Sequence, residues 1–227
     1  MAGSVIRALV AGSKNITEIA ATLGMEKNGN FSEALEQLEE AGLVSADEGK
    51  NPATGKDAHG SYYRLCDNYA RFYLKYVEPV KKAVDHGDFV LGSLDALEGW
   101  ESVKGLAFEN LVVNNSRVII EHLGMGTAHV VSAVPYRRPG AKDGKRSGVQ
   151  VDLLVQTRRS ICLVEVKRQR EIGREVIDEM DAKVKLVPHP ENVSVRTALV
   201  YEGNLAPIVE ADGYFDAIVP FRNILGV

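Results

Sequence analysis

Three ionisable residues on two short apolar segments have the types and spacing of a hydrolytic metal site. Asp152 lies in QVDLLVQ, Glu165 and Lys167 lie in ICLVEVK, and the turn TRRS separates the two segments. Both segments are typical of β-strands, because each is short, apolar and bounded by polar turn residues. Whether the turn uses two residues or four, the antiparallel register predicts Asp152 opposite Glu165, with Cβ atoms about 4.5–5.5 Å apart. Strand side chains alternate, so Lys167 is expected on the face of Glu165.

Two facing carboxylates repel each other unless a cation lies between them. Mg²⁺ binds through one or two carboxylates together with waters and phosphate oxygens, so Mg²⁺ or Mn²⁺ is the cofactor that this pair predicts. A neighbouring lysine would orient an attacking water or help to deprotonate it, and would hold a phosphate oxygen. The chemistry expected of such a set is hydrolysis of a phosphodiester.

A structural interpretation stands beside this one, since a Glu and a Lys two residues apart are also common on the solvated face of a strand. The neighbouring residues favour the catalytic interpretation. Val151, Leu153, Leu154, Val164 and Val166 are apolar, so the charges interrupt a sheet that otherwise reads as buried on both faces. Burying charge lowers stability, which suggests that these charges have a use.

The elements around the strand pair give a mixed α/β (α+β) order, helix–strand–strand–strand–helix–strand. We expect helices over 100–115 and 171–187 and strands near 129–134, 150–156, 161–167 and 193–201, with a last strand over 214–221. A basic loop, 137–146, precedes the strand pair, and it would guide a nucleic-acid backbone electrostatically unless it is simply solvated. The basic residues of that loop are Arg137, Arg138, Lys142, Lys145 and Arg146.

The N-terminal residues predict three helices followed by a β-hairpin, the order of a winged helix-turn-helix. Asn30 and Glu33 have the spacing of a capping box that starts the third helix, and Gly42 is placed to end it. That helix contains four glutamates and no basic residue. Phosphate would repel it, so we expect this domain to contact protein rather than to read DNA. The predicted domains are 1–64, a helical connector over 65–100, and 101–227.

The strand pair resembles the motif of the PD-(D/E)xK nucleases. Asp152 matches the motif aspartate and Glu165-Val166-Lys167 matches (D/E)xK, while Val151 stands where the motif name has proline. The expected element order matches the core of that restriction endonuclease-like fold. The resemblance implies Asp152 and Glu165 as metal ligands, Lys167 as the catalytic lysine, and Glu109 as an auxiliary ligand from the first core helix.

Nearly the whole chain resembles the C-terminal region that follows the ATPase module in archaeal-type AAA+ ATPases, whose most specific mark is YxLxDNYxRFYxxYVxP at 63–79. An ATPase itself is not predicted. The stretch GKNPATGKD has five residues between its glycines where a P-loop has four, and Asp57 stands where Ser or Thr should bind Mg²⁺. The resemblance implies a second possibility, a non-catalytic regulatory or DNA-docking module whose winged helix contacts a protein partner or the ATPase module.

Composition sets the broad class. The chain has 227 residues, 45% of them hydrophobic, and a net charge of -4. No apolar stretch approaches the roughly 20 residues of a membrane helix, so a cytoplasmic protein is expected. The charge is uneven, since residues 135–185 contain thirteen Lys/Arg against eight Asp/Glu. Cys66 and Cys162 lie outside any metal-binding cluster, and we expect no disulfide.

Overall fold

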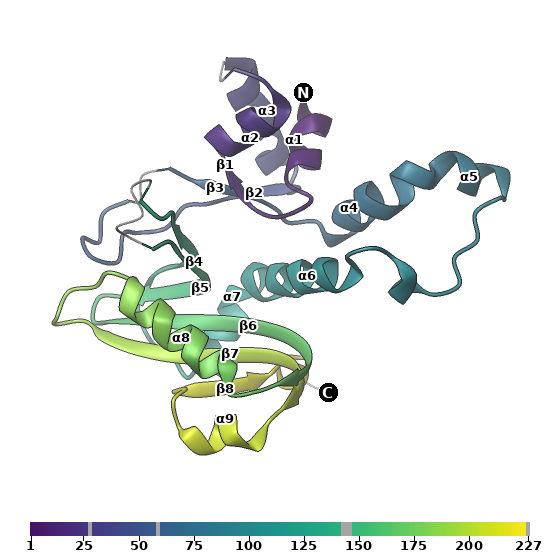
Figure 1. The fold of residues 1–227 in the computed structure, drawn as a ribbon. Coiled ribbons are helices and arrows are strands. Elements are labelled where there is room, and N and C mark those ends of the chain that lie inside the picture. The colour runs from purple at the N-terminus through teal and green to yellow at the C-terminus, as the bar shows by residue number, and fades with distance from the viewer. Residues whose placement is uncertain (27–28, 58–59, 142–146, 226–227) are drawn as a thin grey trace. The chain divides into compact units, whose positions relative to one another are not determined.

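The chain is mixed α/β and contains two β-sheets. A computed structural model describes residues 1–26, 29–57, 60–141 and 147–225 (Figure 1). Its contacts divide the chain into two compact units, one formed by Met1–Asp47 with Gly60–Asn110 and the other by Glu48–His59 with Leu111–Val227. Because such grouping does not measure independent folding, the boundaries at 64 and 100 stay predictions.

Short helices and a small sheet build the start of the first unit. Its elements are α1 (Ala2–Ala8), β1 (Lys14–Asn15), α2 (Ile16–Leu23), α3 (Gly29–Glu40), β2 (Val44–Asp47) and β3 (Tyr62–Leu65). The strands pair antiparallel in the order β1-β3-β2. The apolar side chains between helices and sheet are fully buried, among them Val5, Leu9, Ile19, Phe31 and Leu65. This core is what the helical spacing of apolar residues predicts.

Capping explains where two of these helices begin and end, and it corrects one prediction. The capping box is at Asn15 and Glu18, where Asn15 Oδ1 accepts from the N–H of Glu18 at 2.9 Å and Glu18 Oε2 accepts from the N–H of Asn15 at 2.8 Å. Asn30 was expected in this role for α3, but α3 begins at Gly29 and already contains Asn30. Gly42, with φ of 69°, follows the end of α3 as predicted.

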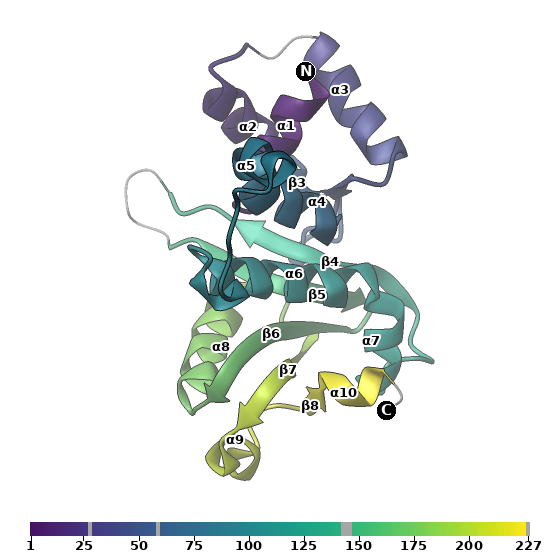
Figure 2. The same cartoon turned by 90° about the vertical axis from the view of Figure 1, so that its right-hand side faces the viewer.

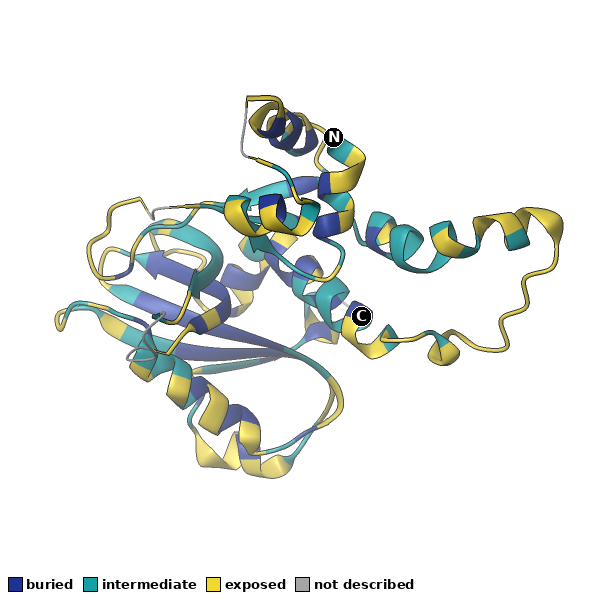
Figure 3. Cartoon of the chain, turned by 45° about the horizontal axis from the view of Figure 1, so that its top comes forward, coloured by how far each residue is buried: buried dark blue, intermediate teal, exposed yellow. Residues whose placement is uncertain are grey.

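The first unit continues as an unbroken helical segment over residues 68–86. Its parts are α4 (Asn68–Phe72), the π-helix η1 (Tyr73–Val77), the 3₁₀ turn η2 (Glu78–Val80) and α5 (Lys81–His86). The 3₁₀ turn η3 (Leu94–Ala96) follows after a non-helical stretch. Pro79 was expected to end the helix, yet α5 follows directly because Pro79 lies in the first positions of η2, where its missing N–H is no loss. Residues 81–99 are exposed almost throughout (Figure 3).

The second unit is built on a five-stranded mixed sheet. Its elements are α7 (Ser116–His122), β4 (Val130–Arg138), β5 (Val149–Thr157), β6 (Ser160–Ile172), α8 (Glu175–Leu186), β7 (Ser194–Leu205), α9 (Pro207–Asp212), β8 (Ala217–Pro220) and α10 (Phe221–Ile224), and the helix α6 (Trp100–Asn114) crosses the boundary between the units. The strand order is β4-β5-β6-β7-β8 (Figure 2). The pairs β4–β5 and β5–β6 are antiparallel, whereas β6–β7 and β7–β8 are parallel. Helix α8 supplies the crossover that the parallel pair β6–β7 requires.

The centre of this sheet is buried on both faces, as the apolar sequence of its strands predicts. Residues 151–156 of β5 and 161–166 of β6 are all buried. Helix α8 covers one face with Val176, Ile177 and Met180, which pack in one cluster with Leu154 and Leu163. Such a rigid, dry framework fixes the directions of the charged side chains that arise from it.

Gly203 marks a close approach between β6 and β7. Its φ is 127°, and a Cβ placed there would lie 1.8 Å from the carbonyl oxygen of Gln169. The β6–β7 register shifts between Arg168 and Glu171, at the same place. Only glycine fits this contact, because any side chain would overlap the neighbouring backbone.

None of the helices in the described parts of the chain is both long enough and apolar enough to cross a membrane.

Candidate functional site

The register of β5 and β6 is the one that the turn predicts, as far as the ladder extends. The ladder pairs Gln156 with Ile161 and proceeds to Leu153 opposite Val164, where it ends. Asp152 and Glu165 are the next residues outward on the two strands. Continuation of the same register would make their carboxylates cross-strand neighbours, and that pairing stays a prediction.

Asp152 is fixed by a hydrogen bond across the strands. Its side chain is buried, with the residue 9% exposed, and Oδ2 accepts from the backbone N–H of Val166 at 2.9 Å. The carboxylate thus gives the buried N–H of Val166 an acceptor just beyond the last registered pair of the ladder. Asp152 is held in one orientation, as a pre-organised ligand or acceptor has to be.

Glu165 is a buried carboxylate between two lysines. The residue is 2% exposed. Its Oε1 lies 3.2 Å from Nζ of Lys167, and its Oε2 accepts a short hydrogen bond from Nζ of Lys183 on α8. A carboxylate this deeply buried is costly unless cations and hydrogen bonds compensate it, and these two ammonium groups do so.

Lys167 shares the face of Glu165, as the alternation of side chains predicted. Its Nζ donates to Oε2 of Glu179 on α8 at 2.7 Å. Burial acts to lower the pKa of Lys167, but its hydrogen bond to Glu179 and the charge of Glu165 outweigh it, so the pKa is raised above its ordinary value. Lys167 is therefore protonated at neutral pH.

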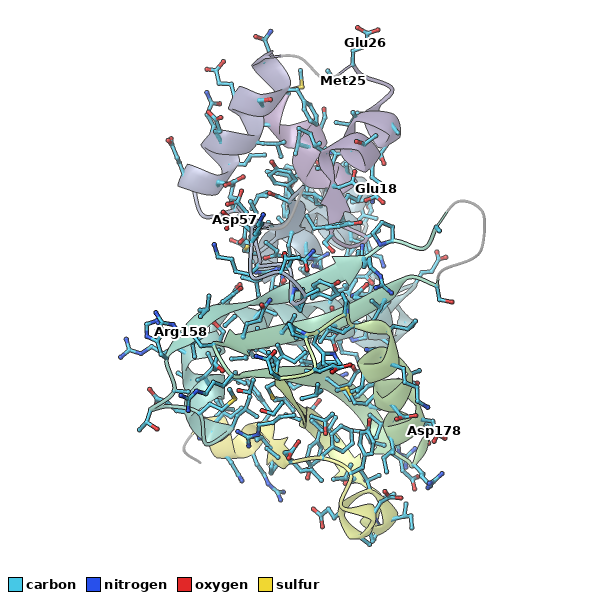
Figure 4. All side chains as sticks on the ribbon, turned by 90° about the vertical axis from the view of Figure 1, so that its left-hand side faces the viewer. Glu18, Met25, Glu26, Asp57, Arg158 and Asp178 are labelled. Carbon is cyan, nitrogen blue, oxygen red and sulfur yellow. The ribbon has the colours of Figure 1, made fainter. Side chains whose placement is uncertain are left out.

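The site thus contains two residues that the sequence interpretation missed, Glu179 and Lys183. They lie four residues apart on α8, a spacing that puts them on one helical face, and this spacing was the available signal. Their neighbour Asp178 is exposed and points away from the sheet, as does Arg158 in the turn between β5 and β6 (Figure 4). These four side chains form a row of alternating charge, in which Lys183 contacts Glu165, Glu165 contacts Lys167, and Lys167 contacts Glu179.

Glu109 belongs to α6 in the part of that helix assigned to the first unit. There its charge acts on Arg71, a residue only 1% exposed, which donates to the carbonyls of Leu65 at 3.0 Å and Leu9 at 3.3 Å. Burial lowers the pKa of Arg71 and Glu109 opposes that shift. The charge of Glu109 thus favours the buried guanidinium of Arg71, while the role of Glu109 as a metal ligand stays a prediction.

The basic residues expected in one loop are divided by the structure. Arg137 and Arg138 are residues of β4 and not of a loop, which corrects that prediction, and Arg137 donates to Oε1 of Gln150 on β5. Pro135 is the physical reason for the error, because the edge strand accommodates it at a register shift between Val134 and Tyr136. The remaining members, Lys142, Lys145 and Arg146, lie outside the described residues.

The donor set fits a divalent ion that is completed by water and substrate. Among the described residues no group of three or more His, Cys, Asp or Glu side chains is arranged to hold a metal. Asp152 and Glu165 nevertheless supply the one or two carboxylates through which Mg²⁺ is bound at phosphate-processing sites. The ammonium of Lys183 occupies a cation position on Glu165, which shows that this oxygen accepts positive charge. Asp152 and Glu165 would hold Mg²⁺ or Mn²⁺, which when bound lowers the pKa of a ligated water and stabilises charge on phosphate.

The chain has a distant structural similarity to a solved protein. No protein-family model matches the chain, and no curated protein matches it. Among solved structures, the crystal structure of protein VC1899 from Vibrio cholerae has a TM-score of 0.41 and 12% sequence identity, covering 98% of this chain and 48% of that one. The chain thus spans about half the length of that protein. The geometry of the site itself therefore carries the functional proposal.

Proposed function

We propose that the chain is a PD-(D/E)xK-type nuclease that hydrolyses phosphodiester bonds of DNA or RNA with Mg²⁺ or Mn²⁺. One observation carries the proposal. Asp152, Glu165 and Lys167 lie together on adjoining buried strands, where charge is costly, and two of the three are less than 10% exposed. A chain that needed only a stable sheet would have apolar residues at these positions.

Each residue has a distinct part in this reaction. Asp152 and Glu165 would hold the metal, and the hydrogen bond from the N–H of Val166 keeps the Asp152 carboxylate in one orientation. Lys167, protonated and anchored by Glu179, holds a non-bridging phosphate oxygen and orients the attacking water through its positive charge. Glu109 is proposed as an auxiliary ligand on the strength of the family resemblance.

Substrate binding is assigned to basic residues that precede β5 in the chain. Arg137 and Arg138, at the end of β4, and Lys142, Lys145 and Arg146, which follow it in the chain, would neutralise the phosphate backbone. The winged helix proposed for residues 1–64 has an acidic third helix, so its partner is a protein, such as the ATPase module of an archaeal-type AAA+ system.

A second candidate is a non-catalytic regulatory or DNA-docking module of such an ATPase system. The observation that favours it is charge compensation within the chain, since Lys183 pairs with Glu165 and Glu179 pairs with Lys167. A nuclease fold that has lost turnover would show the same pairs. In that case the charged set stabilises the sheet and the chain binds nucleic acid or the ATPase without cleaving.

Cleavage assays with the full chain separate the two candidates. Single- and double-stranded DNA and RNA would be incubated with Mg²⁺ or Mn²⁺ and with wild type, Asp152→Asn or Lys167→Met. Asp152→Asn keeps an oxygen that accepts from Val166, so its fold is preserved. Asp178→Asn is the matched control, because Asp178 is an exposed acid on α8.

The nuclease proposal requires metal-dependent cleavage by wild type and Asp178→Asn, with a loss of about 100-fold or more in the other two variants. No cleavage by wild type of any substrate with either metal, or equal cleavage by all four proteins, would reject it. Binding of nucleic acid without cleavage would support the docking module.

A further inference from the structure

Lys183 has a position that neither the motif nor the proposed reaction explains. It lies in the last turn of α8, and its Nζ donates to Oε2 of Glu165. The side chain of Glu165 is 3% exposed and that of Lys183 is 22% exposed, so the pair lies at the margin of the core. The other oxygen of Glu165 faces Lys167 at 3.2 Å. Both oxygens of the carboxylate therefore already face a cation.

This arrangement creates competition for one oxygen. A divalent ion ligated by Glu165 needs the lone pairs that the ammonium of Lys183 uses, and two cations held at one oxygen would repel each other. Lys167 has a second acceptor in Glu179, at 2.7 Å, and its motif position assigns it to the reaction. Lys183 is the cation that has to move.

Glu179 is a second acidic side chain on the same helical face as Lys183. The side chain of Lys183 is long and flexible, and Glu179 lies one helical turn before it on α8. Side chains four residues apart on a helix are neighbours, so a rotation of the Lys183 side chain brings its ammonium toward Glu179 without any movement of the backbone. The exchange needs only rotamer changes.

We infer that Lys183 is an internal counter-cation that occupies Glu165 in the metal-free chain and is displaced when Mg²⁺ or Mn²⁺ binds. The inference rests on the proposed function, because it takes Glu165 to be a metal ligand. Lys183 keeps the buried carboxylate compensated when no metal is present. It also weakens the site. Only molecules in which Glu165 is free of Lys183 can bind the ion, so the apparent affinity falls in proportion to their fraction.

The test measures binding of Mn²⁺ by titration calorimetry, together with the melting temperature in EDTA and in Mn²⁺. Lys183→Met removes the ammonium and keeps an apolar stem, and Lys183→Arg keeps a positive charge. Lys185→Met is the matched control, because Lys185 lies on the same helix turn but pairs with Asp181 on the exposed side. If Lys183→Met fails to fold, Lys183→Gln replaces it, since its amide still donates to Glu165.

If Lys183 occupies Glu165 in about nine-tenths of molecules, its loss tightens the dissociation constant for Mn²⁺ about tenfold. Lys183→Met should also melt lower than wild type in EDTA and gain more from Mn²⁺, whereas Lys183→Arg and Lys185→Met should follow wild type. Binding by wild type that Lys183→Met leaves unchanged or weakens would overturn the inference and leave the nuclease proposal standing. Mn²⁺ binding by none of these proteins would overturn the inference and the metal site together.

Discussion

The ammonium of Lys167 on β6 lies 2.7 Å from Oε2 of Glu179 on α8. This contact fixes the charge of the lysine, because Glu179 and Glu165 together raise its pKa although burial acts in the other direction. Two roles were open for the motif lysine, orienting a water and helping to deprotonate it. A protonated ammonium cannot accept a proton, so the orienting role is the one that we propose for Lys167.

Replacement of Glu179 should lower the pKa of Lys167. Glu179→Gln removes the acceptor charge and leaves burial to act on the ammonium, and the shift is measured by following the lysine Nζ resonance through a pH titration. A raised folded-state pKa stabilises the protein below the ordinary pKa of lysine, and this contribution is lost as the pH rises through the folded-state value. As the pH rises from the ordinary pKa of lysine through the folded-state pKa of Lys167, the free energy of unfolding should therefore fall less in Glu179→Gln than in wild type. An unchanged Lys167 titration, or one equal to that of Asp178→Asn, would contradict the assignment.

Asp152 should contribute to stability as well as to chemistry. Asp152→Ala leaves the buried N–H of Val166 without its acceptor, which costs about 1–3 kcal/mol in the free energy of unfolding. Asp152→Asn retains an acceptor oxygen and should cost less. Urea unfolding of the three proteins measures the difference, and equal stability of the alanine and asparagine variants would show that the hydrogen bond has no stabilising effect.

Gly203 should tolerate no side chain. Gly203→Ala would place Cβ on the carbonyl oxygen of Gln169 and should lower the free energy of unfolding by about 3 kcal/mol or more. Gly213→Ala is the matched control, since Gly213 also has a positive φ, of 67°, but no atom within 4 Å of its Cβ position. That control should lose about 1–2 kcal/mol, from backbone strain alone. Losses of equal size in the two variants would mean that β6 and β7 do not approach closely at Gly203.

The thiol of Cys162 should be inert in the folded protein. Burial raises its pKa to about 12, so little thiolate exists at pH 8, and the residue is 2% exposed. Reaction with a disulfide reagent at pH 8 should be slow in native protein and fast in denaturant. Because the folded-state pKa is raised, the associated stability is present below the ordinary thiol pKa and is lost as the pH rises toward 12. Rapid modification of Cys162 without unfolding would refute its buried position.

The register of β5 and β6 could be predicted because it depends only on the short turn between the two strands. A short turn and the alternation of side chains fix which residues face each other, so the register up to Leu153 and Val164 and the contact between Glu165 and Lys167 agree with the prediction. Glu179 and Lys183 could not be assigned in this way. Their spacing indicates only that they share a helical face, and which strand residues they meet depends on where along the sheet α8 packs.

Other differences have equally specific causes. Two asparagines precede a glutamate by three residues, Asn15 and Asn30, and only the first caps a helix. Pro135 suggested that a loop begins there, but β4 lies at the edge of the sheet and continues past it. In both cases the local signal was ambiguous and tertiary pairing decided the outcome.

The path of the chain between the two compact units has a practical consequence. Residues Glu48–His59 group with the second unit although the residues on either side group with the first. Within the second unit, Gln156 of β5 donates to the carbonyl of Lys50 at 2.7 Å. The backbone therefore passes from one unit to the other three times, and no single cut separates them. A fragment that begins at residue 111 would carry the strand pair but would leave the amide of Gln156 without its acceptor, so a fragment that keeps this contact has to begin no later than residue 50.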